Sequence, residues 1–227
     1  MGTPAKHSIK INWSSNLAYA IGLIASDGSL AKGTYRINFG SKDLEMMENF
    51  RTALGLENKI GKHARGGEVE KRFYYLSFKS KLFYDFLLSI GLMPAKSKII
   101  QDLIVPDGFF ADFLRGLFDG DGSFYSFRDI RWPNSFCYKT SFASASPNFI
   151  AWLKNKLTEL YNVRGYLHKG AGVINLEYTK TDTKKIFEAM YHGPDVLFLR
   201  RKYDKMKSAF EYDAKLHPAS SKHAAVA

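Results

Sequence analysis

The 227-residue sequence has little of what marks several classes of protein. A single cysteine, Cys137, excludes a disulfide framework and a zinc site built on cysteines. The six histidines are scattered, without the paired spacing of metal ligands. No apolar run reaches the roughly 18 residues that a membrane-spanning helix needs, and the N-terminus lacks the hydrophobic segment of a signal peptide. We therefore expect an intracellular protein without a membrane partner, in a compartment that the sequence does not specify.

Positive charge and apolar residues are abundant instead. The chain carries 33 lysines and arginines against 22 acidic residues, a formal net charge of +11. Apolar residues make up 45% of the chain, enough for a packed core. The charge favours a polyanionic partner, although solubility alone also accounts for a basic composition.

The sequence repeats itself at an offset of 94 residues. Gly22, Leu23, Asp27, Gly28 and Ser29 coincide with Gly116, Leu117, Asp121, Gly122 and Ser123. Further along, residues 35–43 resemble 140–146 at an offset of about 103. The increase predicts a longer loop in the second copy, at residues 126–134.

Each copy is expected to run helix, hairpin, helix, hairpin, helix. In the first copy we expect helices over 14–26, 44–54 and 81–90, closed by Gly28, Gly55 and Gly91, and strands over 34–39 and 72–79. In the second copy we expect helices over 111–120, 149–160 and 183–191, and strands over 135–144 and 173–179. This order divides the chain into a first half (1–98), a linker (99–109), a second half (110–216) and a disordered tail (217–227).

Small residues four positions apart mark one face of each repeated helix. They are Gly22 with Ser26 in the first copy and Gly116 with Gly120 in the second. Because glycine in a helix costs about 1 kcal/mol against alanine, the pattern favours tight pairing of the two helices. The alternative is that these glycines only mark helix ends.

An aspartate ends each repeated helix, Asp27 in the first copy and Asp121 in the second. A carboxylate there faces the negative end of the helix dipole. If the two helices pair, the carboxylates meet, and a divalent cation such as Mg²⁺ between them is expected. The alternative is that Asp-Gly-Ser is an ordinary turn into a hairpin. Such an ion, in a basic protein, suits hydrolysis of a phosphodiester, and the lysines that we expect to assist it are Lys42, Lys81 and Lys180.

The two motifs, residues 22–28 and 116–122, resemble the signature helices of LAGLIDADG homing endonucleases. The resemblance extends from about residue 12 to 212. It implies an α+β fold of two pseudo-symmetric αββαββα halves, with two central packed helices and antiparallel sheets that form a saddle over DNA. It also implies that Asp27 and Asp121 bind the metal, while any ligand from position 26 stays unknown. Mg²⁺ is the expected cofactor, with Mn²⁺ as a substitute and Ca²⁺ binding without cleavage.

The activity that the resemblance implies is cleavage of double-stranded DNA at a long asymmetric site, leaving 3′ overhangs. The protein is then a monomer that requires no protein partner. Lys42 matches the Gln or Lys that family members often place after the second strand, and Lys81 and Lys180 match a lysine late in the second hairpin. The sequence departs from the family at Ala25, which replaces an earlier acid of the motif, and at Ala145, which leaves the second half without a counterpart of Lys42.

Polar residues of the predicted hairpins are candidates for contact with DNA, since a two-stranded ribbon fits the major groove. In the first half these are Thr34, Arg36, Asn38, Arg72, Ser77 and Lys79, and in the second half Ser135, Lys139, Ser141, Arg164, Tyr166, Asn175 and Glu177. Candidates for phosphate contacts are Lys59, Lys62, His63, Arg65, Arg128 and Arg131. Because the halves differ at most of these positions, an asymmetric target follows.

The main alternative is a nucleic-acid binder on the same scaffold that does not cleave, either an intron RNA maturase or a transcription regulator. Loss of either acid would favour it. Both Asp27 and Asp121 are present, so the sequence favours the nuclease.

Overall fold

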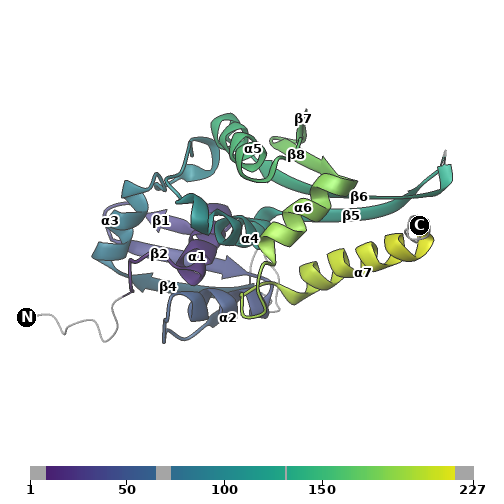
Figure 1. Cartoon of the computed structure of the whole chain (residues 1–227). Coiled ribbons are helices and arrows are strands. Elements are labelled where there is room, and N and C mark those ends of the chain that lie inside the picture. Colours follow the sequence, from purple (N-terminus) through teal and green to yellow (C-terminus); the bar gives the residue numbers. More distant parts are fainter. Residues whose placement is uncertain (1–8, 65–72, 131, 218–227) are drawn as a thin grey trace, which may run out of the picture.

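A computed structural model describes residues 9–64, 73–130 and 132–217 (Figure 1). In the first half α1 (Ser15–Ser26) is followed by β1 (Ser29–Ala31), β2 (Arg36–Ser41), α2 (Leu44–Ala53), β3 (Gly61–His63), β4 (Phe73–Lys79) and α3 (Lys81–Ser89). The second half repeats this order with α4 (Phe110–Asp121), β5 (Ser123–Asp129), β6 (Trp132–Ser144), α5 (Pro147–Tyr161), β7 (Tyr166–Lys169), β8 (Ile174–Thr179) and α6 (Lys180–Met190), and adds α7 (Arg200–Leu216). The predicted α+β class and the order of elements are confirmed.

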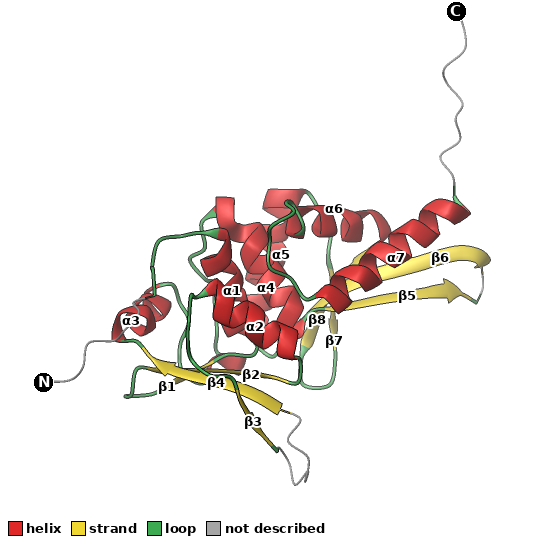
Figure 2. Ribbon diagram, turned by 90° about the horizontal axis from the view of Figure 1, so that it is seen from below, coloured by secondary structure: helices red, strands yellow, loops and turns green. Residues whose placement is uncertain are grey.

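Each half builds one four-stranded antiparallel sheet. The strand order is β1-β2-β4-β3 in the first sheet and β5-β6-β8-β7 in the second. The helices cover one face of the sheets (Figure 2). On that covered face Phe39, Leu76, Phe142 and Leu176 are at most 2% exposed, because side chains alternate between the two faces of a strand. We call the opposite, uncovered face the outer face of each sheet.

Helices α1 and α4 pack against each other at the centre of the molecule (Figure 2). A Cβ on Gly22 would lie 2.1 Å from the carbonyl oxygen of Phe113, and one on Gly116 would lie 2.1 Å from that of Tyr19. The two backbones are therefore in direct contact through the glycines, as the sequence predicted.

Asp119, the earlier acid of the second motif, is fully buried and ties this centre together. Its Oδ2 accepts hydrogen bonds of 2.8 Å from the Tyr19 hydroxyl and from the Leu199 backbone N–H. It therefore links α4 to α1 and to the segment that leads into α7, which is a structural role.

Helix α7 was not expected from the sequence. Only Met206, Ala209 and Asp213 of its 17 residues are buried. The segment lies beyond the last element of the repeat, so the comparison of the two copies gave no expectation for it. It lies along β5 and β6, which extend as a long ribbon from the core (Figures 1 and 2). Asp213 accepts hydrogen bonds from the Tyr138 hydroxyl at 3.1 Å and from Lys180 at 3.0 Å, and so fixes the helix to the second half.

Four sequence expectations need correction or lie outside the described residues. The described residues of 126–134 do not form a loop, since β5 continues to Asp129 and β6 begins at Trp132. Thr34 lies in the β1–β2 turn rather than in a strand, because Tyr35 takes a left-handed conformation with φ 52° and β2 begins after it. Gly28 closes α1 without the left-handed conformation that a helix-ending glycine commonly takes. It is needed because a Cβ there would lie 2.6 Å from Ile24 Cα. The predicted tail beyond residue 217, like Arg65, Arg72 and Arg131, lies outside the described residues.

No helix in the described part of the chain is long and apolar enough to span a membrane.

Candidate active site

The two acids of the repeat meet at the ends of the central helix pair. Asp27 follows the last residue of α1, and Asp121 is the last residue of α4. The helix ends converge so closely that a Cβ on Gly120 would lie 1.9 Å from Ser26 Oγ and 3.0 Å from Asp27 Oδ2. The contact between the glycine-bearing helices thus brings the carboxylates together, where each also faces the negative end of a helix dipole.

Both carboxylates are destabilised in their charged form. Burial, with the negative charge of Asp121 as a second cause, raises the pKa of Asp27 to about 6. Burial also raises the pKa of Asp121. Two acids that repel each other at the ends of two helices favour a bound cation.

The carboxylates of Asp27 and Asp121 suit some divalent metals and not others. Among the described residues no group of three His, Cys, Asp or Glu side chains converges on one point. Mg²⁺ does not require such a cage, because it keeps several waters and binds through one or two carboxylates together with phosphate oxygens of the substrate. Asp27 and Asp121 therefore fit Mg²⁺ and do not fit an ion that needs three or four protein ligands.

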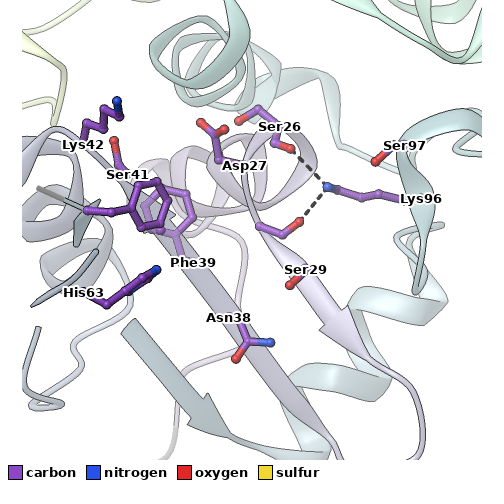
Figure 3. A pocket seen from close by; sticks show the side chains of 13 residues that line it. Ser26, Asp27, Ser29, Asn38, Phe39, Ser41, Lys42, His63, Lys96 and Ser97 are labelled. Carbon is purple, nitrogen blue, oxygen red and sulfur yellow. Dashed lines mark hydrogen bonds between the residues drawn. The ribbon is translucent and has the colours of Figure 1, made fainter. Parts of the chain in front are cut away.

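Two lysines that the repeat did not single out flank the acids, one buried (Lys96) and one half-buried (Lys202). Lys96 is 7% exposed and donates to the carbonyl oxygens of Ser26 at 3.2 Å and Gly28 at 2.7 Å, at the end of α1 (Figure 3). Lys202, on α7, donates at the end of α4 to the corresponding carbonyls of Gly120 at 3.3 Å and Gly122 at 2.6 Å. The two lysines occupy equivalent places in the two halves.

Burial lowers the pKa of both lysines, and that of Lys202 falls to about 8. The charges of Asp27 and Asp121 act in the opposite direction on each. A sequence signal existed, because both lysines lie in a short basic cluster after the last helix of the repeated unit. These clusters lie beyond the last elements at which the two copies of the repeat were matched.

A cavity of about 740 Å³ opens beside Asp27. Lys42, at the end of β2, and His63, on β3, line it together with Lys96 (Figure 3). The structure thus brings together three residues singled out from the sequence, Asp27, Lys42 and His63. It adds Lys96 to them.

The cavity beside Asp121 is smaller, about 260 Å³, and is poorer in cations. Ala145 lines it in the place that Lys42 takes in the first half, directly after the central strand. Tyr75 and Asn175 hold equivalent places in the two sheets, and their partners on the edge strands are Gly61 and His168. Two residues beyond these partners come His63 in the first half and Gly170 in the second, so Gly170 takes the place of His63. The two sites are therefore unequal in charge.

Lys81 and Lys180 are not brought to the acids. Each follows the last strand of its sheet, at the end marked by the pairs Arg36–Lys79 and Lys139–Thr179. Lys42 lies at the other end of β2, five residue pairs away, or roughly 17 Å along an extended strand. Lys81 Nζ contacts Asp85 at 2.5 Å and Lys180 Nζ contacts Asp213 at 3.0 Å.

The outer face of the first sheet carries a connected polar row. Arg36 Nη1 donates to Ser77 Oγ at 3.0 Å, and Ser77 Oγ donates to Asn38 Oδ1 at 2.8 Å. Lys79 is exposed beside Arg36. Lys59 and Lys62 are exposed near the other end of this sheet.

The outer face of the second sheet differs from the first. Lys139 Nζ is bonded to Glu177 Oε2 at 3.1 Å, and His168 Nε2 lies 3.7 Å from Glu177 Oε1. Ser135, Ser141, Asn175 and Tyr166 also lie on this face, and Arg164 is exposed just before β7. Arg128 instead lies on the side of α7, where its guanidinium donates to the Tyr212 hydroxyl.

Comparison with known proteins identifies the fold. No protein-family model and no curated protein matches the sequence. The meganuclease I-SmaMI, bound to uncleavable DNA, matches with a TM-score of 0.60 and 14% identity over 93% of this chain and 94% of its own. I-DmoI in complex with DNA and Mn matches with a TM-score of 0.52 and 18% identity over 79% of this chain and 98% of its own. The N-terminal LAGLIDADG domain of DUF199/WhiA matches with a TM-score of 0.55 and 15% identity over 87% and 88%. The chain has the LAGLIDADG fold.

Proposed function

Starting from this fold, we propose that the protein is a metal-dependent, site-specific endonuclease that hydrolyses both strands of double-stranded DNA. The observation that carries the proposal is the pair Asp27 and Asp121 at converging helix ends, each beside a lysine that donates to the carbonyls of that helix end. A protein that only needed to bind DNA would have no use for two mutually repelling acids in the middle of a basic surface.

Asp27 and Asp121 would hold Mg²⁺, or Mn²⁺ in its place, between the two strands to be cut. When bound, such an ion activates water and neutralises charge on the phosphate. Ca²⁺ is expected to occupy the same carboxylates and to support binding without cleavage.

Lys96 and Lys202 would stabilise the negative charge that develops on the scissile phosphates. Their ammonium groups are held in place by the carbonyls at the helix ends and need no rearrangement when DNA arrives. Because the pKa of Lys202 is lowered to about 8, this residue can also release a proton near neutral pH more readily than an exposed lysine. Lys42 would contact the phosphate on the Asp27 side only.

The outer faces of the sheets would lie in successive major grooves, on either side of the acids. Arg36 and Asn38 suit hydrogen bonding to guanine and adenine, while the exposed Lys59 and Lys62 suit phosphate contacts. Since the two faces differ in sequence, the target is asymmetric. One chain supplies both acids, so a monomer without a protein partner is sufficient, and a cut of both strands across the minor groove leaves 3′ overhangs.

The second candidate function is binding of nucleic acid on the same faces without cleavage. The observation that favours it is the shortage of cations beside Asp121, where Ala145 and Gly170 replace Lys42 and His63. This function gives no role to the repelling acids or to Lys96 and Lys202, and we therefore rank it second.

The test is incubation of the protein with a randomised plasmid library and Mg²⁺, followed by sequencing of the cut ends. We expect a single long consensus with staggered cuts, and no cuts when Mg²⁺ is replaced by Ca²⁺. The absence of cuts, in a protein that still retains DNA or RNA on a filter, would contradict the nuclease and support the second candidate.

A further inference from the structure

The outer face of the second sheet exposes two aromatic rings that no role in cleavage accounts for. Tyr125 is 51% exposed and Phe127 is 43% exposed, and they lie two residues apart on β5. Their neighbours in the chain point the other way, since Phe124 is 5% exposed and Arg128 contacts Tyr212 of α7. Both rings therefore project from one face of the β5–β6 ribbon, opposite Lys139 and Cys137.

Helix α7 supports the ribbon on the side opposite these two rings. Phe124 packs edge-on against Phe210 of α7 with ring centroids 6.0 Å apart, and its carbonyl oxygen accepts a hydrogen bond of 2.8 Å from Lys205. Phe136, on the neighbouring strand, packs against Tyr212 at 4.8 Å. The helix thus occupies the apolar side of the ribbon, and Tyr125 and Phe127 remain on the opposite side.

Beside the two rings, the ammonium group on this face is already paired with a carboxylate. The Lys139 ammonium is bonded to Glu177, which occupies the place that Ser77 takes in the first sheet. Among the described residues, Arg36, the first-sheet counterpart of Lys139, has a serine hydroxyl as its hydrogen-bond partner and keeps further N–H groups for a base. Opposite Arg36 the first sheet has Ala31 in the place of Tyr125. The exposed ring of the first outer face, Tyr75, lies four residue pairs farther along the sheet. At the end of the sheets nearest the ribbon, the first outer face therefore offers hydrogen bonds and the second offers apolar surface.

In the major groove of DNA, thymine is the base that presents a methyl group, and apolar side chains such as phenylalanine contact it there. We infer that Tyr125 and Phe127 read thymine methyl groups in the half of the target bound by the second sheet, while the first sheet reads its half through hydrogen bonds. This inference rests on the proposed DNA-binding function, and it needs no cleavage.

The test replaces thymine by deoxyuridine, which lacks only the methyl group, separately in each half of the selected target. Affinity is measured in Ca²⁺. We expect uracil in the second half-site to weaken binding by about fourfold for each methyl group lost, and uracil in the first half-site to change affinity by less than about twofold. Equal effects in both half-sites, or no effect in either, would overturn the inference.

Protein variants separate the two rings from general effects on binding. The double variant Tyr125→Ala with Phe127→Ala should bind thymine and uracil targets equally, whereas Ile104→Ala, at a residue 68% exposed outside both sheets, should keep the difference. Persistence of the uracil effect in the double variant would contradict the assignment of the rings. Tighter binding of the wild type to the single strand than to the duplex would also overturn it, because the rings would then stack on unpaired bases. Since all these measurements are of binding, failure of cleavage and failure of this inference are distinguishable.

Discussion

Four side chains define the candidate site at the scale of single residues. Asp27 and Asp121 lie together, at the ends of α1 and α4. Lys96 donates to the carbonyls at the end of α1, and Lys202 donates to those at the end of α4. The sequence identified the acids because an acid at a repeated helix end is a local pattern. The lysines reach the site across 70 and 82 residues of chain, and the basic clusters in which they lie do not by themselves indicate that they approach the acids.

The first prediction concerns Lys202. The Lys202 ammonium donates to the carbonyl oxygens of Phe118, Gly120 and Gly122, so it acts on the phosphate through its charge. Lys202→Met should lower the cleavage rate by about 100-fold, the effect of removing a fixed positive charge from beside a developing anion, and should change affinity in Ca²⁺ by less than about threefold. Single-turnover cleavage and filter binding measure the two quantities. Lys205→Met is the matched control, because Lys205 is on the same helix and also donates to a backbone carbonyl, that of Phe124. Equal losses of rate in both variants would assign Lys202 a structural role.

The second prediction uses the raised pKa of Asp27. A carboxyl whose pKa is about 6 in the folded protein, against an ordinary value of 3.8, binds its proton more tightly when folded. The metal-free protein therefore loses stability as the pH rises from about 4 to about 6, and Asp27→Asn removes this loss. Since Asp27 is also more than a third exposed, we expect a gain of only about 1 kcal/mol at pH 7.5 and none at pH 4.

Urea denaturation at the two pH values, in EDTA, measures this difference. Asp204→Asn, an exposed position on α7, is the control and should be neutral at both. A loss of stability in Asp27→Asn at pH 7.5 would contradict the repulsion that we assign to the pair of acids.

At the scale of elements, the contact between α1 and α4 decides whether the site exists. The third prediction is that Gly22→Ala or Gly116→Ala destabilises the protein by about 1 to 3 kcal/mol, because the new methyl group would lie 2.1 Å from a backbone oxygen of the partner helix. Gly108→Ala is the control, since a Cβ there meets no atom within 4 Å. Denaturation midpoints in urea measure the effect. A neutral Gly116→Ala would show that the helices are not in backbone contact.

The order of elements and the helix pairing were predictable because both follow from local patterns: alternation in strands, glycines that close helices, and small residues four apart. Two elements were not. Helix α7 lies beyond the repeated elements, so no counterpart in the first half predicted it, and the β5–β6 ribbon was predicted as a loop because one copy was compared with a shorter one. The places of Lys81 and Lys180 depended on strand register, which the sequence does not reveal.

At the scale of the whole molecule, the two halves are similar in fold and unequal in chemistry. Lys42 and His63 line the cavity beside Asp27, while Ala145 and Gly170 take their places beside Asp121. The cations are thus distributed unevenly between the two sites, and a DNA strand bound beside Asp27 would meet more of them.

The fourth prediction follows from this inequality. The strand beside Asp27 should be cut first, so that nicked plasmid accumulates before linear product. Lys42→Ala should slow that strand selectively and reduce the accumulation of nicked plasmid, and Ala145→Lys should speed the other strand. Duplexes labelled at the 5′ end of one strand or the other give the two rate constants. Equal rate constants in the wild type would contradict the prediction.

The most direct test of the central claim compares Asp27→Asn and Asp121→Asn with the wild type on the selected duplex. Cleavage is followed in Mg²⁺ and affinity in Ca²⁺, on the same preparations. Because each acid is proposed to serve the bound metal and neither contacts a sheet face, both variants should lose double-strand cleavage while binding DNA with an affinity within about tenfold of the wild type. Full cleavage by either variant would contradict the account.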